Sequence, residues 1–198
     1  IDSLRENKVM SLKTRFGNLG NILDFDNLTE ENIYVLDSPI LTNSQFKKFK
    51  KFFSKKVKII DCTFDIGKSL KERIQEIREE AETAVREGST CLVLTDKNIS
   101  SQKASIPSIL YVGAVHSHLV KHGLRGYCSL NIESSDAMDT HSFAILIGVG
   151  ATTVNPYLAI DSIYQRYEKK LFGKSDFETC VNKFKKSIDA GLLKIMSK

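Results

Sequence analysis

The spacing of hydrophobic residues becomes regular from about residue 57 onward. Short runs dense in apolar and β-branched residues alternate there with longer stretches whose apolar residues recur every three or four positions. The short runs are typical of buried strands and the longer stretches of amphipathic helices. The predicted strands cover residues 58–64, 90–96, 127–133 and 152–155.

A predicted helix follows each predicted strand. Gly88 stands where a helix C-cap glycine belongs, and Pro107 suits the first turn of a helix. Ser134, Ser135 and Asp136 are expected to cap the helix that passes through Leu146. The predicted helices cover residues 68–87, 107–123, about 137–146, 156–171 and 176–196.

Four consecutive strand–helix units predict an α/β fold with parallel strands joined by right-handed crossovers. The strands are apolar throughout, as expected for parallel strands covered on both faces. The pattern fits half of an eight-stranded barrel, which is a truncated TIM-barrel-like arrangement, and also a small open sheet. We favour the half-barrel.

Residues 1–56 lack this rhythm and are predicted to form an irregular N-terminal extension, distinct from the α/β domain of residues 57–198. The stretch 16–21 is rich in glycine and asparagine and predicts a loop. Thr42 or Asn43 is expected to cap a helix that carries phenylalanines at helical spacing and the lysine run 47–56. This amphipathic helix accounts for much of the net charge of +5 as a solvated face. We therefore expect no nucleic-acid partner.

No run of about 18 apolar residues occurs, so no membrane partner is expected. The four cysteines lie far apart without C-x-x-C spacing, which argues against a local zinc or iron–sulfur loop and favours a reducing compartment, hence the cytoplasm. Ile1 in place of methionine and the apolar final helix suggest a segment of a longer chain, and no secretory signal opens it.

Polar residues cluster where the predicted strands end, the edge at which α/β proteins place their sites. Their carboxylates could bind a metal or act in acid–base chemistry, but helix capping is the preferred interpretation. The candidates are Asp65, Asp96, Glu133, Asp136 and Asn155.

The histidines add one further hypothesis. His118 and His122 lie four residues apart on one predicted helix and could share a metal, although a helix-surface position is preferred. His141 could bond a neighbouring loop or a partner domain. Glycine-rich phosphate loops and the G-x-S-x-G motif are missing from the sequence, so we assign no catalytic, cofactor-binding or metal residue within this segment.

Six strings are spread along the chain: residues 14–23, Leu36–Asn43, Ile106–Leu119, Thr140–Ala144, Gly148–Ala159 and Gly191–Lys198. They resemble the central domain of the glutamate synthase large subunit, in the family's order and over nearly the whole chain. Ser117 and Ser142 replace expected second histidines and Val149 replaces an expected tyrosine, which puts any role for a histidine pair in doubt.

The resemblance implies a linker and scaffold domain, inactive alone, that helps wall an ammonia path. Its implied partners are a glutamine amidotransferase domain and an FMN-binding domain of the same chain, and a small subunit. The family's enzyme makes glutamate from glutamine and 2-oxoglutarate, using FMN, an iron–sulfur cluster and electrons from NADPH, NADH or ferredoxin. None of those catalytic or cluster residues matches a position here.

Two other functions stay open from the sequence alone. One is a stand-alone enzyme that holds a divalent metal with Asp65, Asp96 and Glu133. The other is an interaction module that docks through the amphipathic helix with the phenylalanines and the lysine run 47–56, called here the Phe/Lys helix.

Overall fold

A four-stranded parallel sheet forms the centre of the computed structural model, which describes residues 9–16 and 33–198. Its strand order follows the sequence, so each crossover steps to the next neighbour in the same direction, as in a barrel. The predicted α/β class with parallel strands is confirmed. The strands are β3 (Val57–Asp61), β5 (Cys91–Thr95), β7 (Ser129–Glu133) and β8 (Thr153–Asn155).

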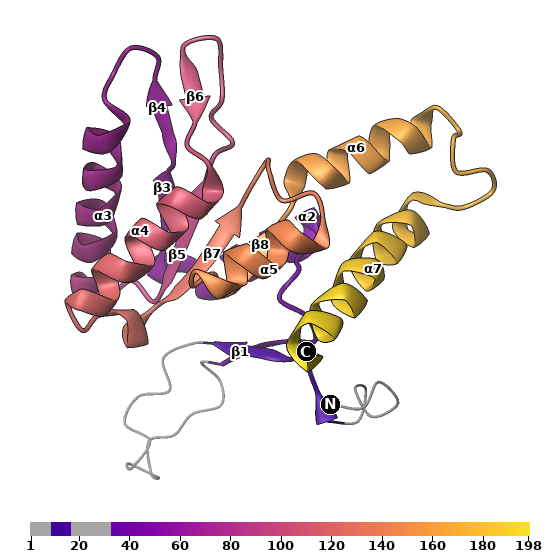
Figure 1. The fold of residues 1–198 in the computed structure, drawn as a ribbon, viewed down its shortest axis with the longest axis horizontal. Helices are drawn as coiled ribbons and strands as arrows, with labels where there is room; N and C mark the ends of the chain where they lie inside the picture. The colour runs from indigo at the N-terminus through magenta and orange to yellow at the C-terminus, as the bar shows by residue number, and fades with distance from the viewer. Residues whose placement is uncertain (1–8, 17–32) are drawn as a thin grey trace.

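Helices cover the two faces of this sheet unequally (Figure 1). One face packs against α3 (Leu70–Arg86), α4 (Ser108–Lys121) and α5 (Thr140–Gly148) through the larger hydrophobic core. The other face packs against α2 (Asn43–Phe53). Strand β5 shows the alternation that separates them: Leu92 and Leu94 join the larger core, whereas Cys91 and Val93 join the phenylalanines of α2. The crossover helices therefore lie on one side, as in a half-barrel, and α2 covers the side that would face a barrel interior.

The residues before α2 belong structurally to the sheet. Ile40 forms a parallel bridge with Val154 at the outer side of β8, and the Leu41 amide donates to the Val154 carbonyl at 2.9 Å. Earlier in the chain, β1 (Thr14–Phe16) pairs antiparallel with β2 (Tyr34–Leu36). The predicted loop at 16–21 falls almost wholly outside the described residues. The division at residue 56 stays a prediction, but α2 on its N-terminal side packs directly on the sheet.

The predicted strand 58–64 is wrong in one respect, because the structure divides it. Strand β3 ends at Asp61, and β4 (Thr63–Asp65) leaves the sheet to pair antiparallel with β6 (Lys103–Ser105). The break is at Cys62, whose amide donates to the Thr95 carbonyl and whose carbonyl accepts from Ile106. The β4–β6 pair extends beyond the sheet (Figure 1), and β6 lies in a segment for which no strand was predicted.

Two further helices, α6 (Tyr157–Glu168) and α7 (Phe177–Ser197), complete the fold with the short 3-10 turns η3 (Ser54–Lys56) and η4 (Arg125–Tyr127). Helix α7 lies along α5 and contributes Ile188 and Leu192 to the larger core. Among the helices that the structure describes, none has the length and apolarity needed to cross a bilayer.

The helix ends confirm most of the predicted capping. Thr42 forms a reciprocal capping box with Gln45 at the start of α2, and Gly88 follows α3 with a φ of 96°. The prediction for α5 was wrong, because Asp139 rather than the 134–136 segment accepts from the Ser142 amide. Asp136 lies too early in the chain and caps a different helix.

All four cysteines are buried and free. Burial raises the pKa of the Cys91 thiol to about 12 and that of Cys128 to about 11. These thiols therefore stay protonated at neutral pH and act as small packing groups.

Candidate functional site

The carboxyl edge of the sheet carries a continuous row of polar residues. Asp61 on β3 is in register with Thr95 on β5, which is in register with Glu133 on β7 and then Asn155 on β8. Parallel strands end on the same side, so the fold brings together residues that lie up to a hundred positions apart. Three of the four are almost fully buried.

Glu133 is the centre of this row. One carboxylate oxygen accepts from the Thr95 hydroxyl at 2.8 Å, and the other contacts the Lys97 ammonium at 3.2 Å. The same ammonium lies 5.0 Å above the ring of Tyr157. The lysine is half-exposed, so it shields a buried carboxylate from the solvent side.

Asp96 is fully buried directly after β5. Its carboxylate accepts from the backbone amide of Ser135, from the Ser135 hydroxyl at 2.7 Å and from the Ser105 hydroxyl at 3.3 Å. Burial, followed by the nearby charge of Asp96, raises the pKa of the Tyr157 hydroxyl. Asp96 thus ties the loop after β7 to the end of β5.

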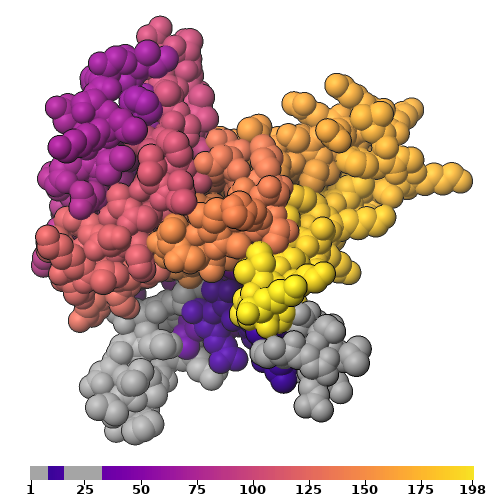
Figure 2. Space-filling view, in the orientation of Figure 1, coloured from indigo at the N-terminus to yellow at the C-terminus, as the bar shows by residue number. Residues whose placement is uncertain are grey.

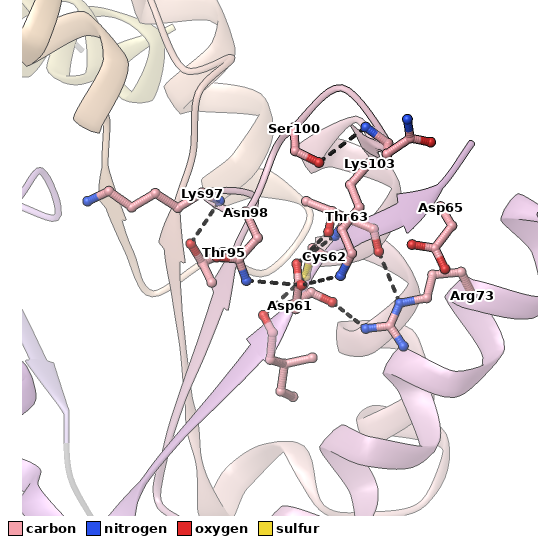
Figure 3. A network of polar contacts seen from close by, with 12 residues as sticks. Asp61, Cys62, Thr63, Asp65, Arg73, Thr95, Lys97, Asn98, Ser100 and Lys103 are labelled. Atoms are coloured by element: carbon pink, nitrogen blue, oxygen red, sulfur yellow. Dashed lines mark hydrogen bonds and ion pairs between the residues drawn. The ribbon is translucent and has the colours of Figure 1, made fainter.

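Asp61 forms a third part of the network (Figure 3). Its carboxylate accepts from the Thr63 amide and hydroxyl and from Asn98, while Arg73 on α3 donates to the Asp61 carbonyl at 2.6 Å. Burial alone would raise the pKa of Asp61, but the hydrogen bonds from Asn98 and Thr63 outweigh it and lower the pKa. Lys103 contributes a weaker attraction at 3.7 Å.

The structure places the remaining predicted residues as follows. Asn155 is buried and donates to the Leu41 carbonyl and to Asn43. Asp136 accepts from the Ser108 amide at 2.9 Å and so caps α4. Asp65 is not at the sheet edge, because it lies on β4 and pairs with Lys68 at 2.8 Å. The exposed His141 lies in the first turn of α5.

These positions argue against the three-carboxylate metal enzyme. The oxygens of Asp96 and Glu133 are occupied by hydroxyl, amide and ammonium donors, and Asp65 lies elsewhere. Within residues 9–16 and 33–198, metal-ligand side chains converge instead at Glu82, His118 and His122, on the outer helices.

Sequence reasoning missed Asp61, Thr95, Lys97 and Tyr157. Asp61 was hidden because the apolar run continues past it to Phe64, which placed the expected strand end at Asp65. A signal existed for Thr95, since it precedes Asp96 at the end of an apolar run. Nothing in the sequence indicated that Lys97 would turn back to Glu133.

Exposed apolar side chains also lie beyond the strand ends. Figure 2 shows a notch in the molecular outline between the β4–β6 pair and α6, above the carboxyl edge. The loops and first helical turns that follow the strands carry the apolar residues. This apolar rim consists of Ile66, Ile99, Ile109, Leu110, Met138 and Leu158, each at least 41% exposed.

The fold and this edge define an α/β half-barrel domain whose polar strand ends are locked together and whose apolar rim is uncovered. The glutamate synthase central domain family matches residues 1–198. The chain belongs to that family.

Relatives place the same segment within much longer chains. The chain is 49% identical to the "Glutamate synthase [NADPH] large chain" of Azospirillum brasilense, covering all of this chain and 13% of the relative. It is 37% identical to the "Ferredoxin-dependent glutamate synthase" of Pyropia yezoensis, of which it covers 14%. It is 35% identical to the NADPH large chain of Bacillus subtilis, again covering 13%. The chain therefore spans about an eighth of the length of these relatives.

Proposed function

We propose that this chain is the non-catalytic central domain of a glutamate synthase large chain. It connects the glutamine amidotransferase domain to the FMN-binding synthase domain and helps wall the path of ammonia between them. The parent enzyme makes glutamate from glutamine and 2-oxoglutarate, with FMN, an iron–sulfur cluster, a small subunit and electrons from NADPH, NADH or ferredoxin.

The match of the whole chain to the central-domain family, together with relatives of which it forms only 13–14%, carries this proposal. The carboxyl edge supports the scaffold role. A catalytic acid or base needs a free oxygen or proton that faces a substrate, whereas Asp96 and Glu133 use theirs to hold strands and loops together. Such a locked edge gives a rigid surface for a neighbouring domain.

The apolar rim supports a contact with that domain. Six large apolar side chains exposed around one edge form the kind of surface that a partner covers. The path of ammonia needs apolar or closed walls, because an ammonia molecule that meets water becomes ammonium, a poor nucleophile. A domain packed on the apolar rim would close the path there.

The Phe/Lys helix does not favour the interaction-module alternative. Phe46, Phe49 and Phe53 of α2 are buried against the sheet. Only the lysine side of the helix, together with the half-exposed Phe52, faces solvent.

The test uses the full-length chain with its small subunit. Leu110→Glu and Met138→Glu each place a charge in the apolar rim, so we expect glutamine hydrolysis to continue while ammonia escapes and less glutamate forms per glutamine consumed. Leu171→Glu is the matched control, because Leu171 is 66% exposed between α6 and α7, away from this edge. Equal ratios of glutamate formed to glutamine consumed in all variants and the unmodified enzyme would refute the interdomain role.

A further inference from the structure

Three metal-ligating side chains converge on the outer surface of the molecule, away from the carboxyl edge. Glu82 lies in the penultimate turn of α3, while His118 and His122 lie one turn apart at the end of α4. One possible ligand atom from each residue lies within 4.8 Å of the other two. Two neighbouring helices therefore supply a carboxylate and two imidazoles to one point.

The distances suit a metal ion after small side-chain movements. The Nε2 atom of His118 is 2.7 Å from Oε2 of Glu82, and Nδ1 of His122 is 3.9 Å from the same oxygen. Zinc bonds to nitrogen and oxygen are about 2.0–2.2 Å, so two ligands of one tetrahedral ion are separated by roughly 3.3 Å. One contact must open and the other close, each by about 0.6 Å. The two rings already lie with their centroids 4.3 Å apart.

The surroundings prepare Glu82 as a ligand. Arg86 donates to its other oxygen, Oε1, from Nε at 2.9 Å and Nη2 at 2.8 Å, which leaves Oε2 directed at the histidines. An outer hydrogen bond that orients a first ligand is a regular feature of metal sites.

Access from solvent is open on the His122 side. The exposed fractions of the side chains are 10% for His118, 22% for Glu82 and 35% for His122. Water could therefore complete the coordination shell. The Nδ1 of His122 contacts the His118 carbonyl at 2.8 Å, and binding through Nδ1 replaces that hydrogen bond with a metal bond.

The geometry points to a metal-binding site formed by Glu82, His118 and His122. The ligands suit a divalent ion such as Zn²⁺. Imidazole ligands favour zinc, nickel or copper over magnesium and calcium. The bound ion links α3 to α4 and has a structural role. This site is independent of the carboxyl edge and of the proposed function.

The test is equilibrium dialysis of the full-length protein against Zn²⁺, counting the ions bound per chain. The variants are His122→Ala and Glu82→Gln, and the matched control is His141→Ala, which removes an exposed helix histidine outside the group. We expect the unmodified protein and the control to bind one more zinc ion per chain than either variant. An excess of Mg²⁺ should not displace that ion.

Thermal unfolding provides a second readout. Zinc should raise the melting temperature of the unmodified protein and of His141→Ala, and should leave that of His122→Ala unchanged. His122 is the most exposed of the three residues, so its replacement leaves the fold intact even if Glu82→Gln does not. Equal zinc counts in the unmodified protein, His122→Ala and His141→Ala would overturn the inference.

Discussion

Buried polar side chains at the carboxyl edge each find several partners, and Asp96 is the clearest case. A carboxylate removed from water costs free energy unless hydrogen bonds replace its hydration. The backbone amide and hydroxyl of Ser135 and the hydroxyl of Ser105 supply that replacement. The arrangement fixes the β7–α5 loop against β5, so a single side chain sets the shape of this part of the edge.

Replacing Asp96 tests this role. Asp96→Ala removes the acceptor and leaves the Ser135 amide without its partner, so we expect the free energy of unfolding to fall by about 3 kcal/mol. Urea denaturation of the 198-residue chain measures the change. Asp65→Ala is the control and should leave the midpoint unchanged, because Asp65 makes only a surface ion pair. Equal midpoints for Asp96→Ala and the unmodified chain would contradict this account.

His116 predicts a pH dependence of stability. Arg125 donates to its Nδ1 at 3.1 Å, which requires the neutral ring, and burial followed by the charge of Arg125 lowers the pKa of His116 from 6.5. The unfolded chain therefore takes up the proton first as the pH falls. This contribution is fully present above pH 6.5 and decreases as the pH drops toward the folded-state pKa.

The variant His116→Asn keeps an acceptor close to the Nδ1 position and cannot titrate. We expect it to flatten the decline in unfolding free energy just below pH 6.5, measured by urea denaturation across that range. His141→Asn should retain the slope of the unmodified chain. A slope unaffected by His116→Asn would assign the decline to other groups.

At the scale of elements, the hydrophobic pattern predicted the main strands and helices, because each helix buries one apolar face and the central strands are buried on both faces. It failed where partners come from distant sequence. The β4–β6 pair is held by cross-strand hydrogen bonds between residues about 40 positions apart, and its polar alternation resembles a loop. Asp61 was missed for the same reason, since only the register with Thr95 reveals where β3 ends.

Close packing between α5 and α7 depends on Gly191. A Cβ built on Gly191 would lie 2.5 Å from Cγ2 of Thr140, at the start of α5. Gly191→Ala should therefore lower the free energy of unfolding by about 1–3 kcal/mol, despite the better helix propensity of alanine. Thermal or urea denaturation of the 198-residue chain, with and without the substitution, measures this change.

Gly113 in α4 offers the matched control, because a Cβ there meets no atom within 4 Å. Gly113→Ala should stabilise the chain by up to about 1 kcal/mol through helix propensity alone. If both substitutions shifted stability in the same direction, the account of the α5–α7 contact would be wrong.

At the scale of the whole molecule, a half-barrel leaves surfaces that a closed barrel would bury. Helix α2 covers most of the inner face, yet Ile59 on the edge strand β3 is 53% exposed. The apolar rim carries six further exposed apolar side chains. The relatives carry this segment as about an eighth of their length, and under the proposed function these surfaces are where neighbouring domains pack.

The most direct test of the interdomain role is a cryo-EM structure of the full-length protein that contains this segment. We predict that Leu110, Met138 and Leu158 lose most of their solvent exposure to another domain of the same chain, with the row from Asp61 to Asn155 unchanged in its internal hydrogen bonds. A structure in which this rim faces open solvent would contradict the proposed scaffold role.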